Sequence, residues 1–321
     1  MSGDKEYQKM ENSILQLFPA ARRPFWEKTA ARQRELREIR LRAGRPIVLN
    51  LGGRELFLDG EGSFTDKPEL GRRAEEGELA ELLEHICHYS LYAFEDELRQ
   101  GFLTVSGGHR VGVAGQAVAE NGKGIRTLKN ICYLNIRVSH EVKGAADKVL
   151  PCMYRGGIPK SALIISPPGC GKTTLLRDLI RQISDGNPYG RGRTVGVVDE
   201  RSEIAGSFCG IPQNDVGMRT DVLDACPKSL GMMMLLRSMS PDVIAIDELG
   251  SREELEALKS AAACGCRILA TAHGSGPEEV KARFDMPERI WEQLFQTVIV
   301  LGRVRGQCVI KELTEGGAED A

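Results

Sequence analysis

Five short and continuously apolar runs in the second half of the chain constrain the fold more than any other feature. They are ALIIS at 162–166, VGVVD at 195–199, VIAID at 243–247, RILATA at 267–272 and TVIVL at 297–301. Strands that are apolar on both faces are typical of a parallel sheet covered by helices on each side. The sequence therefore predicts an α/β domain with a mostly parallel sheet over residues 151–321.

The first half of the chain has a different texture, which predicts a smaller α+β domain over residues 1–150. Short β-rich runs between residues 30 and 60 are separated by Arg-Pro and Gly-Gly, as in strands joined by hairpins. In the segment 77–102, apolar residues recur at helical spacing and Gly101 is expected to end a helix. Two further strands are expected in FLTVSGGHRVGVAGQAV and NICYLNIRVSH, and GGIP marks the linker region between 140 and 158.

The composition of the chain excludes few functions, but it indicates in which cellular compartment the protein is expected. The net charge of −2 and the pI near 6.3 give no strong case for binding nucleic acid. Nine cysteines at irregular spacings, in a chain for which we expect no signal peptide, favour a reducing compartment over a disulfide framework. The apolar runs are shorter than the roughly 20 residues of a membrane span. We expect a cytoplasmic protein, either soluble or peripheral on the membrane.

The segment SPPGCGKTT at 166–174 predicts a phosphate-binding loop, because it lies between an expected strand and an expected helix. Ser166 stands where the consensus has its first glycine. That position lies where the strand leaves the sheet, so a serine with negative φ is expected to be tolerated. The residues expected to bind ATP are Pro168, Gly169, Cys170, Gly171, Lys172, Thr173 and Thr174.

A second strand ends in the acids that hydrolysis requires. In VIAIDE at 243–248, four apolar residues carry Asp247 to the end of a strand, where it is expected to hold Mg²⁺ together with Thr173. Glu248 follows directly and is expected to polarise the attacking water. A strand-end Asp-Glu pair downstream of a phosphate loop favours hydrolysis of ATP over binding alone.

Two more strand ends carry polar residues toward the same edge. VVDERSEIAG at 197–206 places Asp199, Glu200 and Glu203 there, and ATAHG at 270–274 places His273. A single histidine after a strand is more often structural than catalytic. It is the order of the motifs, through the resemblance described next, that implies support of the metal and the γ-phosphate by Glu200 and Glu203 and sensing of that phosphate by His273.

The order of these four motifs resembles that of the secretion-type ATPases of type II and type IV secretion and of pilus retraction. The sequence also resembles the stage III sporulation protein AA family, through GFLTVSGGHRVGVAGQAV, ISPPGCGKTTLLRDLIR, VVDERSEIAG and RSMSPDVIAIDELG. The resemblance implies a RecA-like P-loop domain, ATP and Mg²⁺ as ligands, and a homohexameric motor on the mother-cell side of membrane-embedded sporulation channel proteins. In secretion ATPases the motif that corresponds to VIAIDE commonly ends in Gly-Glu, whereas in this chain it ends in Asp247-Glu248.

Ring ATPases of this kind use an arginine from a neighbouring subunit to stabilise charge on the γ-phosphate. The candidates are Arg237 and, in the first half, Arg110 and Arg137, although an arginine in such a position is more often an ordinary ion-pairing residue. Residues 20–45 carry nine basic and three acidic side chains, which could contact anionic lipid or simply form a solvated face.

Other classes of function stay open at this point. An ABC-type ATPase needs an LSGGQ-like signature between its nucleotide motifs, whereas SGG at 106–108 precedes the loop. A RecA-like nucleic-acid motor shares the expected core. A scaffold that binds ATP without turnover would also keep the loop, although it has no need of Glu248.

Overall fold

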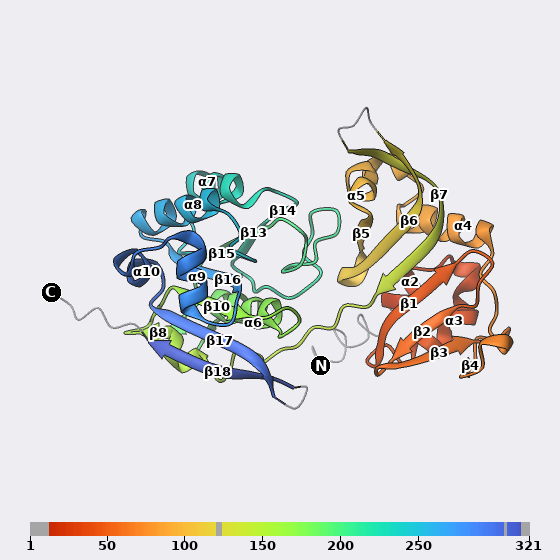
Figure 1. Ribbon diagram of the computed structural model, residues 1–321, viewed down its shortest axis with the longest axis horizontal. Coiled ribbons are helices and arrows are strands. Elements are labelled where there is room, and N and C mark those ends of the chain that lie inside the picture. Colours follow the sequence, from red (N-terminus) through yellow and green to blue (C-terminus); the bar gives the residue numbers. More distant parts are fainter. Residues whose placement is uncertain (1–12, 120–123, 305–306, 316–321) are drawn as a thin grey trace. The chain divides into compact units, whose positions relative to one another are not determined.

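The computed structural model describes residues 13–119, 124–304 and 307–315, which form two compact units (Figure 1). Unit 1 comprises residues 1–140 together with 206–209, and unit 2 comprises residues 141–205 and 210–321. In the described part of the chain, no helix combines the length and the apolar character needed to cross a bilayer.

Unit 1 is built on a seven-stranded antiparallel sheet in the order β4-β3-β2-β1-β7-β6-β5. Its strands are β1 (Leu36–Arg42), β2 (Val48–Leu51), β3 (Arg54–Leu58), β4 (Phe64–Thr65), β5 (Phe102–Val105), β6 (His109–Ala119) and β7 (Ile125–Arg137). Its helices are α2 (Ser13–Gln16), α3 (Arg23–Ala30), α4 (Glu76–Ile86) and α5 (Glu95–Gln100). The sheet residues that alternate inward, such as Ile39 and Leu41, share one core with Trp26 of α3 and Leu79 of α4.

The single helix expected over residues 77–101 is wrong, because the segment forms two helices. The apolar stripe of α4 ends at Ile86, and His88 and Tyr89 then adopt left-handed conformations with φ of 50° and 59°. No helix passes through such residues, so the chain turns and continues as a short 3-10 helix followed by α5. Gly101 does end α5, with a φ of 84°.

Unit 2 contains the predicted α/β layers around a seven-stranded sheet in the order β14-β13-β15-β16-β10-β17-β18. Its strands are β10 (Ala162–Ser166), β13 (Val195–Asp199), β14 (Thr220–Asp224), β15 (Val243–Ile246), β16 (Arg267–His273), β17 (Thr297–Val304) and β18 (Gln307–Glu315). All neighbours pair in parallel except β17 and β18, which are antiparallel. Two small antiparallel pairs flank it: β8 (Tyr154–Arg155) with β9 (Ile158–Pro159), and β11 (Gly186–Asn187) with β12 (Gly190–Arg191).

Helices cover both faces of this sheet, as the continuously apolar strands predicted (Figure 1). They are α6 (Lys172–Asp185), α7 (Lys228–Ser238), α8 (Arg252–Ala263), α9 (Pro277–Phe284) and α10 (Glu288–Leu294). In β10, Ala162 and Ile164 face the core that α6 shares, whereas Leu163 and Ile165 face the core shared by α7, α8 and α9. Because β10, β13, β15 and β16 run in parallel, their carboxyl ends meet at one edge of the sheet.

His109 is a buried polar residue at the start of β6, with 1% of its surface exposed. The backbone N–H of Ser139 donates to Nδ1 at 3.0 Å, so the ring proton of the neutral histidine is on Nε2, which lies 2.9 Å from Ser13 Oγ. Burial, together with a smaller effect of the neighbouring His140, lowers the pKa of His109 to about 4. The imidazole is therefore neutral in the folded unit at pH 7.

Between pH 6.5 and 4 the unfolded chain protonates His109 while the folded unit does not, so stability should fall as the pH falls through this window. The expected contribution is on the order of 2–3 kcal/mol. Urea unfolding at pH 7.5 and pH 4.5 would measure it, with His109→Gln as the variant that cannot titrate. Equal losses of stability in the two proteins would contradict the assignment of a neutral buried imidazole.

Candidate functional site

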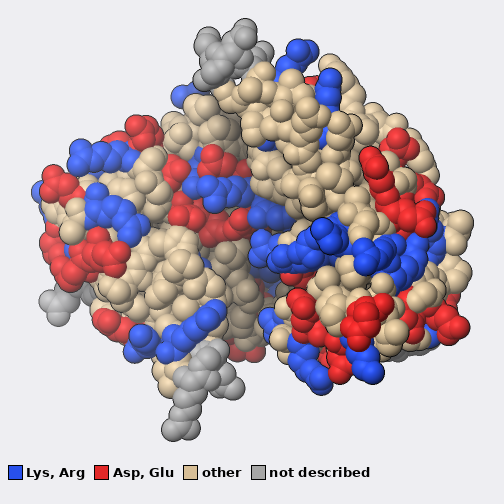
Figure 2. Space-filling view, turned by 45° about the vertical axis from the view of Figure 1, so that its right-hand side comes forward, with Lys and Arg blue, Asp and Glu red and all other residues tan. Residues whose placement is uncertain are grey.

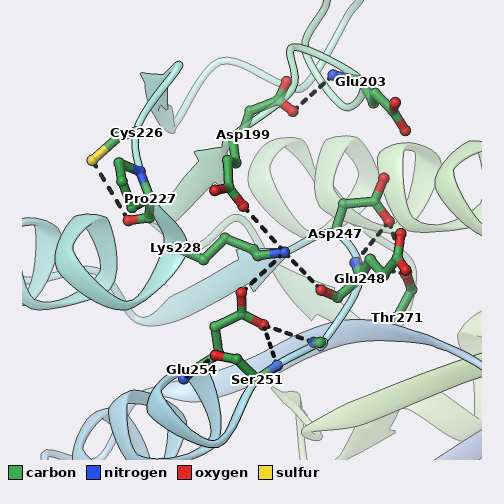
Figure 3. Close-up of polar contacts among 12 residues, drawn as sticks. Asp199, Glu203, Cys226, Pro227, Lys228, Asp247, Glu248, Ser251, Glu254 and Thr271 are labelled. Atoms are coloured by element: carbon green, nitrogen blue, oxygen red, sulfur yellow. Dashed lines mark hydrogen bonds and ion pairs between the residues drawn. The ribbon is translucent and has the colours of Figure 1, made fainter. Parts of the chain in front are cut away.

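Four polar strand ends of unit 2 meet at the carboxyl edge of its parallel sheet, and Figure 3 shows two of them, Asp199 and Asp247, with residues around them. They are Ser166 of β10, Asp199 of β13, Asp247 after β15 and His273 of β16. The loops that follow β13 and β15, with the first turns of α7 and α8, line a cavity of about 240 Å³. It is lined by Asp199, Glu200, Arg201, Glu203, Lys228, Asp247, Glu248, Gly250 and Glu254.

The predicted phosphate loop has the expected strand, turn and helix. Residues 167–171 form the turn and Lys172 is the first residue of α6. Gly169 and Gly171 have φ of 70° and 85°, which only glycine adopts without strain. Ser166 is still part of β10, where it pairs with His273, and its hydroxyl donates to the carbonyl oxygen of Pro167 at 2.7 Å. The serine therefore belongs to the strand rather than to the turn.

Lys172 is buried at the start of α6, with 7% of its surface exposed. Its Nζ lies 3.1 Å from Nδ1 of His273, so the predicted sensor lies directly beside the predicted phosphate-binding lysine. Burial lowers the pKa of Lys172, whereas the carboxylates of Asp247 and Glu248 act in the opposite direction. Pro168, Cys170 and Thr174 lie in the same turn and first helical turn.

Asp247 connects three separate elements. Thr173 Oγ1 of α6 donates to Asp247 Oδ2 at 3.0 Å, and Thr271 Oγ1 of β16 donates to Asp247 Oδ1 at 2.8 Å. The hydroxyl of Thr173 and the carboxylate of Asp247 are hard oxygen ligands side by side, which fits Mg²⁺. Among the described residues no group of three or more His, Cys, Asp or Glu could hold a metal. A site completed by phosphate oxygens and waters matches such a small protein ligand set.

Glu248 has a left-handed backbone, with a φ of 42°. Its N–H points back to Asp247 Oδ1 and to Thr271 Oγ1, each at 3.0 Å. Its Oε2 lies 3.6 Å from Nε2 of His273, so the predicted water-polarising acid is turned toward the lysine and histidine. Such a conformation is unfavourable for a residue with a Cβ and persists only where its surroundings hold it.

The acidic loop after β13 is organised around a buried carboxylate. Asp199 is 1% exposed and accepts the backbone N–H groups of Glu203, Ile204 and Ala205 at 2.8–3.0 Å. Burial raises its pKa to about 6, although these three bonds favour the ionised form. Arg177 of α6 donates to the carbonyl oxygens of Ile204 and Glu203. Asp199 thus shapes the loop, while Glu200 and Glu203 line the cavity.

Sequence patterns did not indicate Lys228, Arg177, Thr271 or Arg303, although each contacts the site. Lys228 donates to the carbonyl oxygen of Glu248 at 2.8 Å, and Arg303 of β17 donates to that of Gly169 at 2.8 Å. Lys228, Arg177 and Arg303 donate to backbone carbonyls that folding brings near, so no spacing in the sequence reveals these three residues. Glu254 had a local signal that was overlooked, since Ser251 and Glu254 form a capping box at the start of α8.

Of the arginines proposed for action between subunits, Arg237 belongs to unit 2, and Arg110 and Arg137 belong to unit 1. Arg237 is exposed in the last turn of α7, whereas Lys228 at the first turn of the same helix contacts the site. Arg110 and Arg137 stand opposite each other on β6 and β7 of unit 1, so they share one face of that sheet. Arg110 also lies over the ring of Phe102, 4.0 Å from its centroid.

The basic segment 20–45 lies in unit 1, and part of its charge is paired. Arg22 bonds Glu81, Arg32 bonds Glu35, and Arg40 bonds Glu38. Figure 2 shows Lys and Arg side chains in a band across the visible face of unit 1, with acidic side chains beside it.

A protein family and a known protein each match most of the chain. A family model described as "Sporulation stage III, protein AA" matches residues 8–317. The chain is 40% identical over 280 residues to stage III sporulation protein AA of Bacillus subtilis (strain 168). The aligned region covers 87% of this chain and 86% of the relative.

Two solved structures share the fold at low sequence identity. The Legionella pneumophila ATPase DotB matches with a TM-score of 0.57 and 18% identity over 91% of this chain and 80% of its own. The pilus retraction motor PilT with bound ADP matches with a TM-score of 0.59 and 18% identity over 92% and 83%. The expected fold, an α+β part followed by a RecA-like P-loop domain, is confirmed.

The loop geometry predicts that substitutions at two consensus glycine positions, 166 and 171, differ in their effect on the affinity for Mg-ATP. Ser166→Gly should leave the affinity for Mg-ATP within about twofold, because Ser166 needs no left-handed conformation. Gly171→Ala should weaken it about 5- to 30-fold, since a Cβ at a φ of 85° costs about 1–2 kcal/mol. Isothermal calorimetry with Mg-ATP measures both. A stronger effect from the serine change than from the glycine change would contradict this account of the loop.

Proposed function

The chain belongs to the sporulation stage III protein AA family, and on this premise we propose that it is a magnesium-dependent ATPase of the secretion type. One observation carries the proposal. The hydroxyl of Thr173 lies 3.0 Å from the carboxylate of Asp247, beside Lys172 and Glu248. A domain that only needed a glycine-rich turn would have no reason to bring these four side chains together.

Each residue has a role in the proposed reaction. The N–H groups of the loop and the N-terminus of the 14-residue helix α6 bind the phosphates, and Lys172 neutralises charge on the β- and γ-phosphates. Thr173 and Asp247 would hold Mg²⁺, which supplies further charge neutralisation on the phosphates. Glu248 orients the attacking water and accepts its proton, while His273 lies where it would contact the γ-phosphate.

The proposal extends to a motor. We expect a homohexamer on the cytoplasmic, mother-cell side of membrane-embedded channel proteins between mother cell and forespore, with peripheral contact to the membrane. Membership of a sporulation family and the fold shared with a pilus retraction motor support it. Arg237, Arg110 and Arg137 are the candidates for completing a neighbour's site. Light scattering with and without ATP tests assembly, and a monomer in both conditions would contradict the ring.

Glu248→Gln should abolish turnover and spare binding, because the amide keeps the shape of the side chain but accepts no proton. We expect phosphate release to fall at least about 100-fold, with the affinity for ATP changed less than about threefold. Glu256→Gln is the matched control, since that glutamate is exposed on α8. Release at the wild-type rate in Glu248→Gln would refute the assignment. A wild-type protein that binds ATP but releases no phosphate would instead be a nucleotide-binding scaffold.

Turnover should also require Mg²⁺ held through the hydroxyl of Thr173. Chelation with EDTA should stop phosphate release. Thr173→Val should raise the Mg²⁺ concentration needed for half-maximal release about tenfold or more, because the isosteric side chain lacks the ligand oxygen. Thr173→Ser keeps that oxygen and should stay within about threefold of the wild type. Identical magnesium titrations for the valine and serine variants would disprove this role.

A further inference from the structure

Lys228, the first residue of α7, is placed against the helix dipole. Cations are unfavourable at the N-terminus of a helix, and the side chain is only 12% exposed. The charge of Lys228 therefore does not stabilise α7, the helix that carries it. Its charge is instead matched by two carboxylates: Oε2 of Glu200 at 3.3 Å and Oε1 of Glu254 at 3.2 Å.

The third partner of Lys228 is the backbone of the proposed catalytic acid. Its Nζ donates to the carbonyl oxygen of Glu248 at 2.8 Å, as Figure 3 shows. Glu248 is left-handed, so both of its peptide groups need partners that fix it. The N–H is held by Asp247 and Thr271, and the carbonyl by Lys228.

Glu254 fixes the other end of the same loop. Its Oε2 accepts the N–H of Gly250 at 2.7 Å and that of Ser251 at 3.3 Å, while Oε1 faces Lys228. Glu254 is 12% exposed, like the lysine. Lys228 and Glu254 together enclose the short segment between β15 and α8, and they are joined to each other.

We propose that Lys228 is a positioning residue for hydrolysis, which holds Glu248 turned toward His273 and links it to Glu200 of the acidic loop. The inference rests on the proposed ATPase activity and adds a residue to its site. Loss of the ammonium frees the carbonyl of Glu248 and lets the residue return to a more favourable backbone conformation. The carboxylate then leaves the position of the attacking water. Lys172 and Thr173 are untouched, so nucleotide binding persists.

The test is Lys228→Met, which keeps the length of the side chain without its donor and charge. We expect kcat for phosphate release to fall about 10- to 100-fold, as displacement of a catalytic group by about an ångström does. The KM for Mg-ATP should stay within about threefold. Lys228→Arg, which restores a donor and a charge, should recover most of the rate. Lys259→Met is the control and should match the wild type, because Lys259 is a partly exposed lysine of α8 that pairs with Glu256.

A second readout separates positioning from general support of the fold. If Lys228 acts through Glu248, adding Lys228→Met to Glu248→Gln should cause no further loss in single-turnover hydrolysis. Additive losses, or a KM that rises in step with the fall in kcat, would overturn the proposal. A wild-type rate in Lys228→Met would also overturn it. So would a folded Lys228→Arg protein that recovers none of the rate. If Lys228→Met fails to fold, the rate of Lys228→Arg is the test. A wild-type protein without phosphate release would refute the ATPase proposal itself.

Discussion

The site depends on Asp247, because its carboxylate joins elements that the sheet alone would leave apart. β16 lies between β10, which leads into the phosphate loop, and β15, which ends at Asp247. Thr173 reaches across this strand to one carboxylate oxygen, and Thr271 on the intervening strand holds the other. Both oxygens are thus used, which fixes the rotation of the side chain as well as its position. Lys172, Glu248 and His273 then have defined distances from one another.

Two strand-end aspartates of the same sheet are used in contrasting ways. Asp199 is 1% exposed, and its carboxylate accepts hydrogen bonds from three backbone N–H groups of its own loop. Asp247 is partly exposed at the cavity and bonds side-chain hydroxyls that a metal could also use. The difference arises from the following chain. The segment after Asp199 folds back around it. The segment after Asp247 donates to it through the N–H of Glu248, and beyond that N–H it is bonded to Lys228 and Glu254.

The sequence was informative wherever one local rule decided the outcome. Continuously apolar runs predicted β10, β13, β15, β16 and β17, and the glycine pattern predicted the turn before α6. β14 and β18 were missed, since TDVLD and QCVIKELTE carry polar residues along edge strands. The helix break at His88 and Tyr89 was missed because nothing in their side chains demands a left-handed backbone. Lys228 and Arg177 were missed because they bind carbonyl groups, which every residue possesses and which only the tertiary fold selects.

The segment after β15 also shows how a capping box at the start of a helix can support the proposed catalytic site. In an ordinary capping box the acid at the third helical position satisfies the N–H of the capping residue. Glu254 does this for Ser251, but it also accepts the N–H of Gly250 and pairs with Lys228. Every backbone N–H from Glu248 to Ser251 consequently has a partner, that of Leu249 being the carbonyl of Thr271. Such a segment has little freedom to change shape between steps of a cycle. The movement that the proposed motor needs must therefore come from elsewhere in the chain, because relaxing this loop would withdraw Glu248 from the site.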